Sequence, residues 1–282
     1  MNTSLHKIQK STFRFEHINS SNRSRFKAFF YVIISSITAI CILITWYAAT
    51  NYFTINTLLL PTPQKVWSAF LAVYNNGYKS YSFWQHLSSS LARLSKAFGL
   101  AITIAVPLGL ASGYIPWIKA IFEPIIEFYR PLPPLAYYTL IVLWMGIGNE
   151  SKIMLLFLAC FAPIYIACAS AVIKIAPNYL RNAASLGANR VQIFFRVIIP
   201  FTLPDIFISM RTAFGVGYTT LVASEMVAAR SGIGWMVLDA SNYLRSDIIF
   251  VGIIVMSITG IILDQFIRVL ERVLVPWKGK DI

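Results

Sequence analysis

The chain contains 282 residues, of which 57% are apolar and only 12% are charged, with a mean hydropathy of +0.65. A soluble globular domain is about a quarter charged, so this composition excludes a soluble protein and predicts membrane-spanning helices. The net charge of +13 does not predict nucleic-acid binding, because the basic residues lie beside and between apolar runs, where they set membrane topology.

The N-terminal part of the chain combines a basic tail with an apolar run. Residues 1–27 are polar and include six basic side chains, and residues 28–49 carry no charge. A helix needs about 20 apolar residues to cross the hydrocarbon core, so 28–49 is the first predicted span. Residues 50–85 are more polar and are predicted to form an extracytoplasmic connection, with a short surface helix beginning near Pro63.

Five further spans are predicted within one domain that covers residues 86–270. Their approximate bounds are 97–115, 133–147, 153–173, 203–229 and 248–270. Residues 271–282 form a C-terminal tail. The predicted fold class is therefore an all-α integral membrane protein with six transmembrane helices.

The distribution of basic residues predicts the orientation. Six spans place both termini and the segment 174–200 on the same side of the membrane. Sixteen Lys and Arg residues lie on that side and seven on the other. Positively charged loops remain in the cytoplasm, so both termini and residues 174–200 are predicted to be cytoplasmic.

Prolines interrupt several of the predicted spans. Pro107 and Pro163 lie inside apolar runs, and a further cluster occupies 131–134. Each proline removes a helical hydrogen bond that lipid cannot replace. Such breaks are tolerated beside other helices or a wet cavity, which favours a bundle with an internal pathway over passive membrane anchors.

The segment 178–200 is predicted to be a helix–turn–helix at the cytoplasmic face. Small residues end its first helix, Gly187 breaks the backbone, and Pro200 is expected to end its second helix. Thr202 and Asp205 are expected to form a capping box that opens the next span. From composition alone, an interfacial amphipathic helix that touches only lipid headgroups remains an alternative.

The spacing within this segment resembles the EAA loop of binding-protein-dependent ABC importer permeases. That loop reads Glu-Ala-Ala, three residues, Gly, nine residues and then Ile-x-Leu-Pro. Here Arg181, Asn182 and Ala183 take the first three places, Gly187 takes the glycine place and Pro200 the proline place. The resemblance implies that this loop couples the protein to its ATPase. Arg181 and Asn182 depart from the family pattern.

Other stretches are similar to the nitrate/sulfonate/taurine group of these permeases, and most nearly to the taurine permeases. They are Trp84-Gln-His-Leu-Ser-Ser-Ser-Leu-Ala-Arg93, Glu123 to Ala136, Trp144-Met-Gly-Ile-Gly148, Ser151 to Pro163, and Gly215 to Glu225. The resemblance covers about residues 84–277.

This resemblance implies a MetI-like type I importer transmembrane domain that functions as a dimer, most simply a homodimer, in the bacterial inner membrane. It implies two partners, an ATP-binding subunit that holds ATP and Mg²⁺ and an extracytoplasmic substrate-binding protein. The transported solute would be a taurine-like organosulfonate or a related anion. The chain itself contains no Gly-x-x-x-x-Gly-Lys-Ser/Thr motif, and it is predicted not to be an enzyme.

One face of the fifth predicted span carries charged and polar residues. At 3.6 residues per turn, the residues that share this face are Arg211, Gly215, Tyr218, Val222 and Glu225. A charge inside a span costs about 2.5–3.5 kcal/mol on insertion scales, so each should face protein or water. One hypothesis is that this stripe lines the translocation path. The alternative is that Arg211 extends to the headgroups and Glu225 makes a structural contact in the dimer or in a loop.

Two other classes of function are weighed against an ABC permease. A secondary transporter that works alone would be expected to contain an inverted repeat, and it gives the segment 178–200 no role. A membrane scaffold gives the proline-broken spans no role. The histidines, His6, His17 and His86, are far apart in the sequence, so neither a catalytic nor a metal site is predicted.

Overall fold

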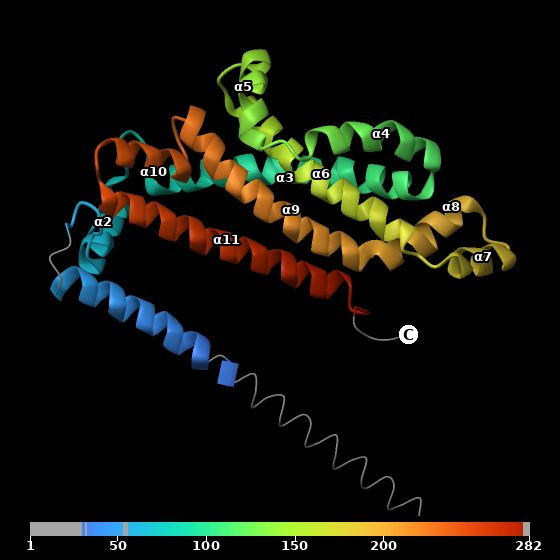
Figure 1. The fold of residues 1–282 in the computed structure, drawn as a ribbon, viewed down its shortest axis with the longest axis horizontal. Coiled ribbons are helices and arrows are strands. Elements are labelled where there is room, and N and C mark those ends of the chain that lie inside the picture. Colours follow the sequence, from blue (N-terminus) through green and yellow to red (C-terminus); the bar gives the residue numbers. More distant parts are fainter. Residues whose placement is uncertain (1–29, 32, 53–55, 279–282) are drawn as a thin grey trace, which may run out of the picture. The chain divides into compact units, whose positions relative to one another are not determined.

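The computed structural model describes residues 30–31, 33–52 and 56–278. Within these residues the protein is helical and contains no strand (Figure 1). A first helix, Ile33–Tyr52, belongs to one compact unit, Met1–Lys65, and the rest of the chain forms a second unit. The helices that follow are α2 (Pro63–Asn76), α3 (Phe83–Tyr114), α4 (Pro116–Tyr129), α5 (Pro134–Met145), α6 (Asn149–Ile173), α7 (Pro177–Ser185), α8 (Arg190–Ile193), the π-helical turn η1 (Phe194–Ile198), α9 (Ile199–Ala228), α10 (Ile233–Asn242) and α11 (Ser246–Leu274).

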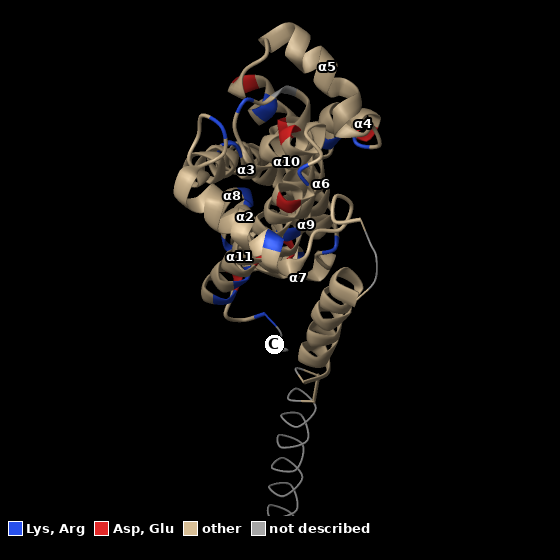
Figure 2. Ribbon diagram, turned by 90° about the vertical axis from the view of Figure 1, so that its left-hand side faces the viewer, with Lys and Arg blue, Asp and Glu red and all other residues tan. Residues whose placement is uncertain are grey.

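Five helical stretches in the described residues are long and apolar enough to cross a membrane. They are Ile33–Tyr52, Phe83–Tyr114, Asn149–Ile173, Arg190–Val227 and Ser246–Leu274. The remaining predicted span, the third (133–147), corresponds to α5, an apolar helix of 12 residues. Most of the ribbon carries neither acidic nor basic side chains (Figure 2), as expected of a chain that meets lipid over most of its surface.

The second unit is built around α3, α6, α9 and α11, whose long axes are roughly aligned (Figure 1). Helices α7 and α8 lie at one end of this bundle and α10 lies at the other. The predicted surface helix near Pro63 is α2. The predicted boundaries of the third, fourth and sixth spans agree with α5, α6 and α11 to within a few residues.

Glycines allow α3 and α6 to approach closely. A Cβ on Gly109 would lie 2.6 Å from the carbonyl oxygen of Tyr165, and one on Gly113 would lie 2.6 Å from that of Ala169. These distances are shorter than any van der Waals contact, so only glycine allows this separation of the backbones. Close backbone approach through small residues is the usual way in which membrane helices pack.

Two sequence-based boundaries are wrong. Helix α3 begins at Phe83 rather than near residue 97, because the polar residues of its first turns, His86 and Arg93 among them, are buried against other helices. Pro200 does not end a helix, since α8, η1 and α9 continue without a break.

Pro200 is the second residue of α9 and directly follows the π-helical turn η1. The hydroxyl of Thr202 donates to the carbonyl oxygens of Ile198 and Ile199 at 2.9 and 3.2 Å. It therefore bonds back along a continuous helix and does not form the predicted capping box.

Candidate functional site

The segment Pro177–Ile198, hereafter the end segment, turns at Gly187. Helix α7 closes with the N–H of Gly187 donating to Ala184 O at 2.9 Å and the N–H of Ala188 donating to Ala183 O at 3.1 Å. This pair of bonds is a Schellman motif, which places the residue after the cap in the left-handed region. Gly187 has φ = +87°, so the break that the sequence predicts is confirmed.

The second half of the end segment starts at its own cap. The Asn189 side chain accepts a hydrogen bond from Gln192 N at 2.8 Å, and the Gln192 side chain accepts one from Asn189 N at 2.9 Å. This reciprocal capping box starts α8 without help from another helix. Ile193 and Ile198 are buried in the core of the bundle, so they attach the segment to the transmembrane helices.

Most of the remaining side chains of the end segment are exposed. Arg181, Asn182 and Gly187 are exposed and Ala183 is half-buried. Among its large apolar side chains, Leu186 is 89% exposed, and Val191 and Phe195 are more than 60% exposed. Exposed apolar side chains on a helix–turn–helix that is anchored in the bundle core by Ile193 and Ile198 are typical of a surface that a partner protein covers.

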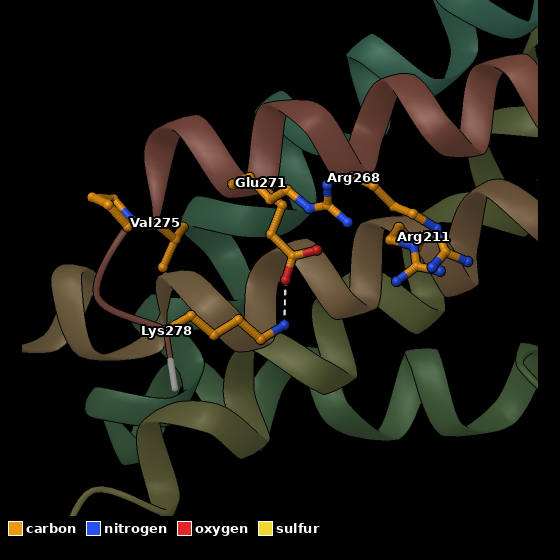
Figure 3. Close-up of a pocket in the computed structure, with 7 residues that line it drawn as sticks. Arg211, Arg268, Glu271, Val275 and Lys278 are labelled. Carbon is orange, nitrogen blue, oxygen red and sulfur yellow. Dashed lines mark hydrogen bonds and ion pairs between the residues drawn. The ribbon is translucent and has the colours of Figure 1, made fainter. Parts of the chain in front are cut away.

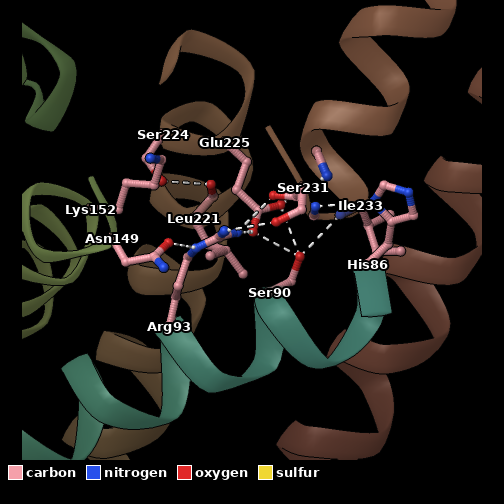
Figure 4. A network of polar contacts seen from close by, with 12 residues as sticks. His86, Ser90, Arg93, Asn149, Lys152, Leu221, Ser224, Glu225, Ser231 and Ile233 are labelled. Carbon is pink, nitrogen blue, oxygen red and sulfur yellow. Dashed lines mark hydrogen bonds and ion pairs between the residues drawn. The ribbon is translucent and has the colours of Figure 1, made fainter. Parts of the chain in front are cut away.

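The opposite end of the bundle contains a buried ion pair. Arg93 on α3 and Glu225 on α9 meet at 2.6 Å between Nη1 and Oε1, with their side chains only 6% and 1% exposed (Figure 4). Ser90, one helical turn before Arg93, donates its hydroxyl to the same carboxylate at 2.8 Å. The charged and polar groups of two transmembrane helices thus satisfy each other inside the protein, as intramembrane charges require.

The loop before α10 and the first residues of α10 surround this carboxylate. The N–H of Gly234 donates to Glu225 Oε2 at 3.0 Å, and that of Ile233 donates to Ser90 Oγ at 3.0 Å. A Cβ on Gly232, where φ is +127°, would lie 2.4 Å from the Glu225 carboxylate. Glycine is therefore required at this position by both its backbone conformation and its contact with the buried acid.

Two further elements join this network. The Nε of Arg93 donates to Asn149 Oδ1 on α6 at 2.8 Å. His86 on α3 accepts a bond from Gly232 N at 3.1 Å through Nδ1, so its Nε2 carries the proton and donates to Tyr78 O at 3.2 Å. We refer to His86, Ser90, Arg93, Asn149, Glu225 and residues 231–234, where α10 begins, as the buried network. It connects four helices, α3, α6, α9 and α10.

A separate polar contact holds α10 from outside. Asp239 accepts hydrogen bonds from the Tyr78 hydroxyl and the Lys79 ammonium, both at 2.8 Å. Partial burial raises the pKa of Asp239, but these bonds and the charge of Lys79 outweigh it and leave that pKa below its ordinary value. The hydrogen bond to Asp239 raises the pKa of Lys79. This pair is charged across the neutral pH range.

Comparison with known proteins identifies the kind of protein that carries these features. Residues 105–275 match the family described as the inner membrane component of binding-protein-dependent transport systems. The chain belongs to this family. It is therefore a multi-pass membrane permease of an ABC importer, a transport subunit rather than an enzyme, whose partners are an ATP-binding subunit and a substrate-binding protein.

Relatives of the permease include two curated transport proteins of Escherichia coli strain K12. The taurine transport system permease protein TauC is 41% identical over 247 residues, which cover 87% of this chain and 90% of TauC. The aliphatic sulfonates transport permease protein SsuC, named as putative, is 32% identical over 236 residues, covering 84% and 88%.

A solved structure shares the fold of the permease. The inward-facing MetNI methionine ABC transporter matches with a TM-score of 0.51 at 16% identity, over 64% of this chain and 93% of that chain. The MetI-like architecture inferred from the sequence is confirmed by this match.

The polar stripe predicted on α9 contacts other helices of the permease. Arg211 donates from Nε to Asp264 on α11 at 3.0 Å, and the Tyr218 hydroxyl donates to Met256 O on α11 at 2.7 Å. Glu225 belongs to the buried network, which agrees with the alternative of a structural contact in a loop. Gly215 is exposed and Val222 is half-buried. The assignment of the other four residues to the translocation path stays a prediction.

Sequence reasoning missed the partners of Glu225 because it placed His86 and Arg93 outside the spans. One signal was available. His86, Ser90 and Arg93 are spaced by four and three residues, the spacing of neighbours on one helix face. Polar residues with that spacing, next to an apolar run, predict a helix that continues upstream with a polar face buried against protein.

Proposed function

We propose that this permease carries a small organosulfonate such as taurine, or a related anion, across the bacterial inner membrane. The observation that supports it most is the 41% identity to a taurine permease over 87% of the chain, against 32% for an aliphatic sulfonate permease. Membership of a binding-protein-dependent family gives the competing secondary transporter no support, because such a transporter works without an ATPase.

We further propose that two copies of this chain flank one pathway, with both termini and the end segment in the cytoplasm. The excess of basic residues on that side supports this orientation. ATP and Mg²⁺ would be bound by the partner ATPase, whose groove would cover Leu186 and its exposed apolar neighbours. Gly187, Ala183 and Pro200 would shape the segment, and Arg181 and Asn182 would meet the ATPase directly. Closure of the ATPase pair would move the end segments and switch the bundle between two states.

Substrate class can be tested with the assembled transporter in proteoliposomes. Uptake of labelled taurine should depend on ATP inside, on the binding protein outside and on the permease. Calorimetry should show that the binding protein takes taurine in preference to nitrate and to riboflavin. ATP-dependent uptake of another solute class, with no competition by taurine, would contradict the sulfonate assignment and leave the ABC permease assignment intact.

The coupling role can be tested at Gly187. No atom lies within 4 Å of a Cβ built there, so a substitution acts through the backbone alone. Left-handed conformations cost an L-residue about 1–2 kcal/mol, least for Asn and most for β-branched residues. Transport per ATP hydrolysed should therefore fall in the order Gly187→Asn, Gly187→Ala, Gly187→Val, at normal abundance in the membrane.

Gly99→Val is the matched control for this series. Gly99 also has open space around its Cβ, but it lies inside helix α3 and does not have a positive φ. This variant should keep hydrolysis and transport coupled. Normal coupling in Gly187→Val would show that the end segment does not connect the permease to its ATPase.

A further inference from the structure

A basic cavity lies where the last turns of α11 and the residues after it face α9 (Figure 3). It has a volume of about 340 Å³, within the range of pockets that hold small ligands. The residues that line it are Arg211, Arg268, Glu271, Arg272, Val275, Pro276 and Lys278.

The cavity carries more positive than negative charge. Asp264 accepts from the Nε atoms of two of the lining arginines, Arg211 and Arg268, at 3.0 and 2.8 Å. Glu271 is paired with Lys278. Among the described residues, Arg272 has no hydrogen-bond or ion-pair partner. In the described part of the chain, four cations therefore share two carboxylates, which leaves an excess of two positive charges.

The arginines keep most of their donors available. Arg211 and Arg268 each use Nε for Asp264, and no bond from their Nη groups to any described residue is present. A guanidinium has five N–H donors in a planar fork, and this fork fits the oxygens of phosphate-like groups two at a time. Val275, which is buried, offers an apolar wall for the carbon end of a small ligand.

We propose that this cavity binds a tetrahedral oxyanion, either the sulfonate group of a small solute or the phosphate of a lipid headgroup. A sulfonate presents three terminal oxygens and the phosphodiester of a lipid presents two, and each brings one negative charge to the same arginine forks. An anion held there would neutralise the excess positive charge of the side chains that line the cavity. The proposal needs no assumption about the transported solute.

The cavity lies at the same end of the bundle as the end segment. Helices α9 and α11 run antiparallel, since Arg211 pairs with Asp264 while Tyr218, further along α9, bonds to Met256, earlier in α11. The C-terminal turns of α11 therefore lie beside the first turns of α9, which continue from the end segment. The location of the cavity on the cytoplasmic side rests on the proposed topology, whereas the proposed class of ligand does not.

The test uses the permease assembled with its ATP-binding subunit in lipid nanodiscs. In one arm, the discs contain only phosphatidylcholine, and methanesulfonate is titrated at low ionic strength by calorimetry. In the other arm, the discs contain phosphatidylglycerol, and native mass spectrometry counts the lipids retained. The variant Arg268→Gln/Arg272→Gln removes the excess charge while leaving Arg211 in place.

Each lost charged hydrogen bond should weaken binding by about 10-fold or more, so the double variant should lose at least that factor. Arg268→Lys/Arg272→Lys keeps the charge without the fork and should retain part of the affinity. Arg130→Gln is the matched control, because Arg130 is also about half exposed and paired with an acid one turn away. It should bind like wild type.

The two arms of the experiment distinguish a sulfonate ligand from a lipid phosphate. Saturable methanesulfonate binding that is lost in the Gln variant assigns the site to a sulfonate. Retained phosphatidylglycerol that is lost in the Gln variant assigns it to a lipid headgroup. No saturable binding in either arm, or equal binding by wild type and both double variants, would overturn the proposal. Because binding is measured at equilibrium, neither result depends on whether taurine is imported.

Discussion

The ion pair between Arg93 and Glu225 should dominate the stability of the end of the bundle at which α10 lies. Its side chains are 6% and 1% exposed, so water cannot replace a lost partner. Removing one partner from a buried pair leaves an uncompensated charge and costs about 3–5 kcal/mol. We therefore expect Glu225→Met and Arg93→Met each to lower the free energy of unfolding by about that amount.

The double variant Arg93→Met/Glu225→Met should behave differently. Replacing both charges with apolar side chains of similar length leaves no buried charge, although the N–H of Gly234 loses its acceptor, which costs about 1–3 kcal/mol. The double variant should thus be no less stable than either single variant. The resulting coupling free energy should be at least about 2 kcal/mol, within the range measured for directly interacting residues.

Equilibrium unfolding in mixed micelles, followed by circular dichroism, measures all four proteins of this cycle. The matched control is the cycle formed by Arg211→Met and Asp264→Leu. This second pair joins α9 to α11, but its side chains are 28% and 32% exposed. Partly exposed pairs contribute about 0–1 kcal/mol, so its coupling should be small. Equal coupling in the two cycles, or additive effects in the first, would refute the reasoning that burial makes the Arg93–Glu225 pair strong.

Three further predictions concern other parts of the permease. Gly109→Ala should lower the thermal stability of the protein, since the new methyl group would lie 2.6 Å from the carbonyl oxygen of Tyr165, and fluorescence-detected size exclusion after heating measures this loss. Asn189→Ala should cost about 1 kcal/mol by removing a helix N-cap, seen as faster hydrogen exchange of the α8 amides with the rest of the bundle unchanged. The pKa of Asp239 is lowered in the folded protein, so its pairing with Lys79 stabilises the protein fully above the unfolded-state pKa of about 3.9. This stabilisation is lost as the pH falls through the lower folded-state pKa. Below about pH 4 the melting temperature of wild type should therefore fall more steeply than that of Asp239→Asn.

Much of the fold could be predicted because apolar runs report directly on membrane spans. The third, fourth and sixth spans agree with α5, α6 and α11, since an apolar run marks a membrane helix whether lipid or other helices surround it. The turn at Gly187 could also be predicted, because few residue types other than glycine readily adopt a left-handed backbone conformation. These features depend on local sequence.

The errors share a different cause. Helix α3 extends upstream to Phe83 because the polar side chains of its first turns meet partners on other helices, so a polar stretch that looks like a connection is part of a span. Likewise, the smooth passage from η1 into α9 at Pro200 depends on a π-helical turn, which no residue preference specifies. In both places tertiary contacts or backbone detail decided a boundary that local sequence left open.

The two charged residues of α9 show where spacing stops being informative. Arg211 and Glu225 are 14 residues apart, which correctly rules out a bond between them. Their real partners, Asp264 and Arg93, lie 53 and 132 residues away in the sequence and come from different helices. Helix α9 is thus held to α11 near its middle through a partly exposed pair, and to α3 near its C-terminal end through a buried pair. Arg211 lines a cavity of about 340 Å³, whereas the space beside Glu225 is only about 10 Å³, so a small ligand fits next to Arg211 but not next to Glu225.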